Sequence, residues 1–265
     1  MARHHSPSML CNRIALSGLI ASIALVASAV AAQPSASPTL EDVAYQDCLS
    51  LARRQPEDGF AHAQTWSETG GGLPAAHCAA LALIELKHYA DAAARLEALL
   101  PLAQKQVPHL SVQLLDQAAN AWLLADQPQR AKALLDIALQ ASPDQADLLI
   151  DRALASAALQ DHSAAAADLS RALTLDPTRA EAYALRASAR RHLKDFGGAM
   201  EDAETALAIE PRLPEGLLER GILRAQTGDR SGARADLIQL RMIAPDSPAA
   251  ETAGRVIEQM DVRAE

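Results

Sequence analysis

Charged side chains that could pair with each other or bind a ligand recur in this sequence every 34 residues. Three arginines and three aspartates show this spacing. In the repeat before the first of them, the position of the arginine holds Ala118 and the position of the aspartate holds Leu134, so both charged residues are absent together. Because a half-buried guanidinium without a carboxylate is destabilising, this joint loss favours structural ion pairs over contact with a ligand. We expect each arginine to pair with an aspartate of its own repeat or of a neighbouring one. The residues are Arg152, Arg186 and Arg220, and Asp168, Asp202 and Asp236.

No arrangement of histidine, cysteine or glycine has the spacing of an enzyme or metal site. His77 adjoins Cys78, as in a catalytic dyad, but the sequence places no third group beside them. The glycines at 70–72 lack the strand and helix that flank a phosphate-binding loop. Outside the N-terminal segment 1–32, the other histidines follow no motif such as HExxH: His62, His88, His109, His162 and His192. We therefore predict no catalytic residue, no metal and no cofactor, and an unrecognised enzyme is the least favoured alternative.

The composition predicts that helices pack directly against helices. Hydrophobic residues make up 49% of the chain but aromatic residues only 3%, and alanine is abundant. A sheet would need more β-branched and aromatic side chains. The net charge is −9 and no basic tract occurs, so a nucleic acid is not an expected partner.

The N-terminal segment 1–32 has the order of a secretory signal peptide. Arg3 and Arg13 precede an uncharged apolar run, and small residues follow, with cleavage expected after Ala32 or, as the alternative, after Ala31. The alternative is that residues 14–32 remain as an anchor in the inner membrane, because they are barely long enough to span a bilayer. Residues 33–40 are expected to form a short disordered lead-in. The predicted localisation is periplasmic or secreted.

Two cysteines remain after such a cleavage, Cys48 and Cys78. In an oxidising compartment an even pair favours a disulfide, which would join the first two helical hairpins. The alternative is two buried thiols that act as small apolar side chains. A zinc site is not expected, because no histidine and cysteine cluster lies nearby.

Prolines divide the chain at the same 34-residue spacing. Segments 145–160 and 164–175 show helical periodicity with a short break between them, and a proline follows the second segment. Because proline donates no backbone hydrogen bond and clashes with the preceding turn, it closes one helical hairpin before the next begins. The prolines are Pro143, Pro177, Pro211 and Pro245, and Pro74 and Pro108 are 34 apart with an offset of one residue.

This period and its small residues resemble the tetratricopeptide repeat (TPR) family, whose 34-residue unit is helix–turn–helix. Small residues recur in the family where the two helices cross, and they allow a close approach. Here they are Ala119, Ala153, Ala187 and Gly221 on the first helix, and Ala131, Ala165, Ala199 and Ala233 on the second. The resemblance implies an all-α fold in which TPR hairpins stack as a right-handed α-solenoid with a C-terminal capping helix.

The resemblance also divides the chain into repeats. The last helix would cover the final open apolar face, as solenoids require. The predicted units are a degenerate hairpin at 41–72, a divergent repeat at 73–111, repeats at 112–145, 146–179, 180–213 and 214–247, and a capping helix at 248–265.

In this family the first helices line a concave groove. Members that clamp the acidic C-terminus of a chaperone carry a lysine and an asparagine there; Asn120 matches but the lysine is missing, so that activity is not assigned. An apolar groove with a polar rim suits an amphipathic helix or an extended apolar peptide. The groove residues that the resemblance implies are Asn120, Leu123, Leu124, Ile150, Leu154, Ser188, Arg191, Leu218 and Ile222.

Together these features predict an exported scaffold or adaptor without enzymatic activity, which binds a protein or peptide segment in its groove. The alternative is a membrane-anchored TPR assembly factor or chaperone for envelope or cytochrome biogenesis. The partner's identity does not follow from the sequence.

Overall fold

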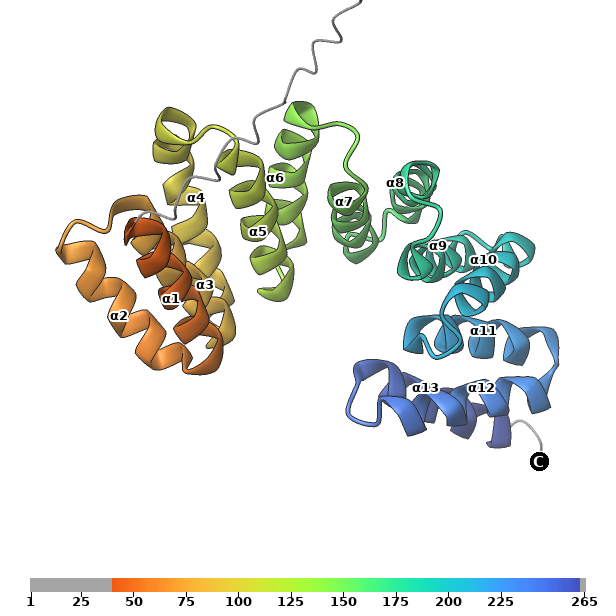
Figure 1. Cartoon of the computed structure of the whole chain (residues 1–265). Coiled ribbons are helices and arrows are strands. Elements are labelled where there is room, and N and C mark those ends of the chain that lie inside the picture. Colours follow the sequence, from red (N-terminus) through yellow and green to blue (C-terminus); the bar gives the residue numbers. More distant parts are fainter. Residues whose placement is uncertain (1–39, 263–265) are drawn as a thin grey trace, which may run out of the picture. The chain divides into compact units, whose positions relative to one another are not determined.

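The computed structural model describes residues 40–262, which form thirteen α-helices and no strand (Figure 1). The predicted signal segment 1–32 and most of the lead-in lie outside these residues, whereas Leu40 begins the first helix. The helices are α1 (Leu40–Arg54), α2 (Pro56–Glu68), α3 (Gly72–Glu85), α4 (Tyr89–Gln106), α5 (Leu110–Leu124), α6 (Pro128–Ala141), α7 (Ala146–Ala158), α8 (His162–Leu175), α9 (Ala180–His192), α10 (Phe196–Ile209), α11 (Pro214–Thr227), α12 (Arg230–Ile243) and α13 (Pro248–Val262).

Consecutive helices pack as hairpins, and each hairpin packs on the next (Figure 1). The last helix, α13, contacts both α11 and α12, and its Ala250, Ala253 and Met260 are buried in their shared core. The first helices of successive hairpins also touch, α5 with α7, α7 with α9, and α9 with α11. We call the surface that these four helices share the first-helix face. The predicted all-α fold of stacked helical hairpins is confirmed.

The prolines at 34-residue spacing do not all lie between helical hairpins. The set from Pro143 to Pro245 lies in the short segments between hairpins, after the second helix of each. Pro74, in contrast, lies in the first turn of α3 and separates no elements. Proline is tolerated there because the N–H groups of a first turn have no partner within the helix. Its 34-residue distance from Pro108, which does precede a helix, is therefore not a sign of punctuation.

Alanine allows the two helices of a hairpin to cross closely. Ala119, Ala153 and Ala187 on the first helices are buried, as are the alanines opposite them on the second helices. Gly221 holds the corresponding position in α11, where an added Cβ would lie 2.7 Å from Leu237 Cδ2. The core therefore has little bulk at each crossing, and buried leucines such as Leu149, Leu169 and Leu173 pack in the same core.

In three hairpins the turn between the two helices has a similar conformation and the same capping aspartate. Asp161, Asp195 and Asp229 precede the second helices, and each accepts a hydrogen bond from a backbone N–H three residues later, at 2.9–3.1 Å. The residue before each aspartate has a positive φ, 64° at Gln160, 66° at Lys194 and 94° at Gly228. This conformation costs a non-glycine residue about 1–2 kcal/mol. These three aspartates recur every 34 residues, so the sequence also carries a signal for the turns inside the hairpins.

The recurrent arginines and aspartates meet across the seam between the two helices of one hairpin. Arg152 on α7 holds Asp168 on α8 with two hydrogen bonds, at 2.7 and 2.8 Å. The same two distances occur between Arg186 and Asp202, and between Arg220 and Asp236. These hydrogen bonds to carboxylates raise the pKa of all three arginines above its ordinary value.

Further contacts extend these pairs. Arg190 and Arg224 each add a second cation to the aspartate of their hairpin, at 2.9 and 2.7 Å. Arg152 also reaches the preceding hairpin, where its Nη1 lies 2.9 Å from Asp136 Oδ1. Pairing thus occurs both within a repeat and between neighbours. Since Asp202 and Asp236 are only 3% exposed, their charges depend on these arginines.

We expect Asp202→Ala to lower the free energy of unfolding by about 3 kcal/mol, because it leaves Arg186 half-buried without a carboxylate and leaves Arg190 with only the exposed Asp195, at 3.8 Å. Urea denaturation followed by circular dichroism measures the change. The matched control is Asp144→Ala, which removes an exposed pair with Arg171 and should cost under about 1 kcal/mol. Equal losses for the two variants would contradict a special role for the buried pair.

We expect Lys194→Gly to stabilise the protein by about 0.5–1 kcal/mol, because glycine adopts a positive φ without steric penalty. Gly228→Ala should have the opposite effect, although an added Cβ at Gly228 meets no atom within 4 Å. The same denaturation measurement applies. A stabilising Gly228→Ala would show that backbone conformation does not limit this turn.

Candidate functional site

The predicted groove residues lie on the first-helix face, but not all of them are accessible. Leu154, Ser188 and Ile222 are half-buried, as are Asn120, Leu123 and Leu218. Leu124 is 56% exposed at the end of α5. Ile150 is only 4% exposed and belongs to the main apolar core, so its side chain is unavailable to a ligand. Ile150 therefore has a packing role and does not line the predicted groove.

A cavity of about 190 Å³ opens between α7, α8 and α9. Two of the predicted groove residues line it, Leu154 from α7 and Ser188 from α9. The cavity exists where alanines are too small to fill the space between the helices. The rest of its wall is formed by Ala153, Ala157, Gln160, His162, Ala165, Leu169, Leu185, Ala189 and His192.

Two histidines stack at this cavity. The rings of His162 and His192 are 4.2 Å apart, and their planes differ by 13°. Burial lowers the pKa of His192, and the positive charge of Arg191 and the neighbouring His162 add to the effect. His162 Nδ1 is buried and has no hydrogen-bond partner within residues 43–262. No sequence motif indicates this pair, because the two residues come together only through the packing of successive hairpins.

An acidic pair lies one repeat away on the same face. Asn120 of α5 donates hydrogen bonds to Asp151 of α7, at 3.0 Å, and to Asp116, at 3.4 Å. Burial raises the pKa of Asp116 to about 7, and the hydrogen bond and charge of Asp151, together with the charge of Asp147, contribute. The two carboxylates therefore lie close enough to repel each other when both are ionised.

Two arginines of the first-helix face already form ion pairs with carboxylates other than Asp116 and Asp151. Arg179 pairs with Asp147, and Arg191 holds Glu219 through hydrogen bonds of 2.7 and 3.2 Å. Arg191 is thus tied to a carboxylate of α11 and is not a free groove residue. In the described part of the chain, no lysine or arginine forms an ion pair with Asp116 or Asp151.

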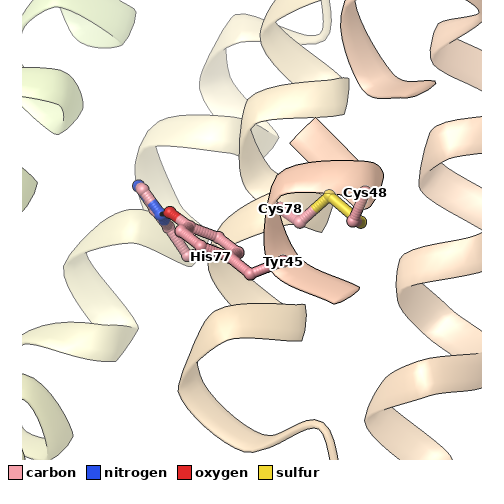
Figure 2. The surroundings of a disulfide bond; sticks show 4 residues. All are labelled: Tyr45, Cys48, His77 and Cys78. Atoms are coloured by element: carbon pink, nitrogen blue, oxygen red, sulfur yellow. Dashed lines mark hydrogen bonds between the residues drawn. A yellow bond between two sulfur atoms is a disulfide. The ribbon is translucent and has the colours of Figure 1, made fainter. Parts of the chain in front are cut away.

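The neighbouring pair His77 and Cys78 does not form a catalytic dyad. Cys78 is bonded to Cys48, with 6.3 Å between the two Cα atoms, and the disulfide joins α3 to α1 (Figure 2). His77 points the other way, toward Tyr45 of α1, whose hydroxyl lies 2.5 Å from its Nδ1 (Figure 2). Its Nε2 lies 2.7 Å from Gln117 Oε1 of α5. Burial lowers the pKa of His77, so the neutral ring links three helices.

Two further functions find no support between residues 40 and 262. No group of three or more histidine, cysteine or acidic residues is placed to hold a metal ion there. No helix in the same range has the length and apolar character that crossing a membrane requires. The possible anchor at 14–32 lies outside these residues.

We expect Asp116→Asn to stabilise the protein by about 1 kcal/mol at pH 8 and by much less at pH 4. The folded-state pKa of about 7 lies above the ordinary value of 3.8, so the folded state loses stability as pH rises between these values. The asparagine variant does not ionise and escapes this loss. Urea denaturation at both pH values tests this, with the exposed Asp47→Asn as control. A variant less stable than the parent protein at pH 8 would contradict the repulsion between Asp116 and Asp151.

Comparisons with known proteins identify the fold. No family model and no curated protein matches the chain. A solved MamA RS-1 ArsTM double mutant is similar over 66% of this chain and 97% of its own, with a TM-score of 0.56 and 16% identity. YrrB, described as a TPR protein with an unusual peptide-binding site, is similar over 72% of this chain and 96% of its own, with a TM-score of 0.51 and 19% identity.

Shorter domains also match. The second TPR domain of human RPAP3, solved with an HSP70 peptide, is 26% identical over 44% of this chain and 98% of its own, with a TM-score of 0.42. The likeness to MamA and YrrB, together with thirteen helices packed in consecutive hairpins, shows that the described part of the chain is a TPR-type α-solenoid.

Proposed function

We propose that this protein is an exported, non-enzymatic TPR scaffold that binds a segment of a partner protein on its first-helix face. The observation that carries the proposal is the cavity between α7 and α9, with Leu154 and Ser188 on its wall. A hollow whose wall combines alanine and leucine with the polar side chains of Gln160, His162, Ser188 and His192 can receive a peptide side chain. TPR solenoids offer such a surface along successive first helices.

The chemistry of the reactive residues supports binding over catalysis. Cys78 has no free thiolate, because it is bonded to Cys48. His77 is buried between Tyr45 and Gln117 and cannot reach a substrate. The stacked histidines lie beside alanine and leucine, with no nucleophile other than the hydroxyl of Ser188 in the cavity wall.

Export is supported by the order of residues in segment 1–32 and by the disulfide, since disulfides persist in oxidising compartments. The alternative of a membrane-anchored assembly factor differs in one respect, the fate of residues 14–32. N-terminal sequencing of the protein from its native cell decides between them. A start at Ala32 or Gln33 supports the exported scaffold, and a retained 14–32 segment supports the anchored factor.

Partner binding is tested by a photo-crosslinking amino acid in place of Leu154, introduced in the native cell. We expect a crosslinked protein partner, because this side chain lines the cavity on the first-helix face. The control position is Ile137, which is 50% exposed on α6, a second helix. Equal capture at both positions, or none at Leu154, would contradict binding on the first-helix face.

A further inference from the structure

We propose that the bound segment is extended and carries a lysine or arginine two or three residues from an apolar residue of leucine or phenylalanine size. The apolar side chain enters the cavity between α7 and α9, and the basic side chain pairs with Asp116 and Asp151. This inference rests on the proposed function and specifies the chemistry of its partner.

The cavity sets the size of the apolar residue. Its volume of about 190 Å³ exceeds the roughly 150 Å³ of an engineered apolar cavity that binds benzene. The wall contributed by Ala153, Ala157 and Leu169 offers an apolar surface without hydrogen-bonding side chains. The flat faces of His162 and His192 suit contact with an aromatic ring or a branched aliphatic side chain.

The acidic pair selects a cation over an anion. Two carboxylates that share one site repel each other, and an ammonium or guanidinium between them would relieve this repulsion. Asp147 lies close enough to add to the negative field, although it also pairs with Arg179. Because the nearby arginines already hold Asp147 and Glu219, the chain itself supplies no cation to this pair within its described residues. An acidic tail would meet repulsion here.

The repeat fixes the spacing between the two subsites. Asn120, which bridges the acidic pair, corresponds by the 34-residue period to Leu154, which lines the cavity. The two subsites are thus one helix spacing apart, about 8–10 Å. An extended chain advances about 3.3–3.6 Å per residue, so two to three residues cover this distance. Asp151 and Leu154 are three residues apart on α7 and share one face of that helix.

The test uses synthetic peptides of about ten residues, mainly Gly and Ser, with a central Phe and a Lys two or three residues before or after it. Binding is measured by fluorescence anisotropy. We expect these peptides to bind at least about tenfold more tightly than peptides in which Glu replaces Lys or Ser replaces Phe. A control peptide of the same length, with the Phe near one end and the Lys six residues from it, should give no such gain. Equal or tighter binding of the Glu peptides, or no binding by any peptide, would overturn the inference.

Two protein variants assign the subsites. Asp116→Asn with Asp151→Asn should reduce the preference for Lys over Glu to less than about twofold and keep the dependence on Phe. Ala157→Leu fills the cavity and should remove the dependence on Phe while it keeps the preference for Lys. Ser188→Val is a second variant that fills the cavity, for use if Ala157→Leu does not fold. Asp144→Asn removes an exposed carboxylate that pairs with Arg171 and belongs to neither subsite, so it is the control for added neutral amides. A Lys preference that survives the double substitution would overturn the assignment.

Failure of the inference is distinguishable from failure of the proposed function. Capture of a partner through Leu154, with a yield unchanged by the Asp116→Asn and Asp151→Asn substitutions, would leave the function standing and overturn the inference. Capture of a second copy of this chain would also overturn it, because the face would then be an interface between copies. A captured segment with a basic residue two or three positions from a leucine or phenylalanine would support it.

Discussion

The close crossing of two helices through alanine or glycine is the contact on which the rest of this structure depends. A single hairpin of about 30 residues cannot bury its apolar side, so stability comes from stacking one hairpin on the next. Ala153, Ala187 and Gly221 keep each crossing short, and the added Cβ at Gly221 would lie 2.7 Å from Leu237. Because the crossings are narrow, any polar group placed at the seam is desolvated and needs a partner. The buried Asp202 and Asp236 satisfy this requirement through two arginines each.

The same small side chains create the candidate binding site. Between α7 and α9, alanine lies where a larger residue would complete the core, and a cavity remains. Its position on the first-helix face follows from the repeat, since residues that correspond by the 34-residue period face the same way. Leu154, Ser188 and Ile222 all belong to this set, but only the first two line the cavity between α7 and α9.

The negative charge between α5 and α7 remains because the arginines of the first-helix face pair with other carboxylates. Most of them neutralise aspartates at the seams or bridge neighbouring helices, as Arg191 does with Glu219. What remains between α5 and α7 is a carboxylate pair held together by Asn120. Such a pair is unfavourable in the isolated protein, and a bound cation would remove the repulsion. The geometry therefore argues against the recognition of acidic tails.

The sequence by itself determined the all-α class, the 34-residue period and the division into helical hairpins, because proline, alanine and apolar spacing act locally. It also indicated which arginines and aspartates recur together. Only the tertiary structure decided that Ile150 is buried, that His162 stacks on His192, that Asp116 faces Asp151, and that a cavity opens between α7 and α9. These features arise where successive hairpins pack against each other. This packing is determined by side chains that are far apart in the chain. A repeat pattern places such residues at corresponding positions, one helix spacing apart, but does not determine which side chains meet or where a cavity remains.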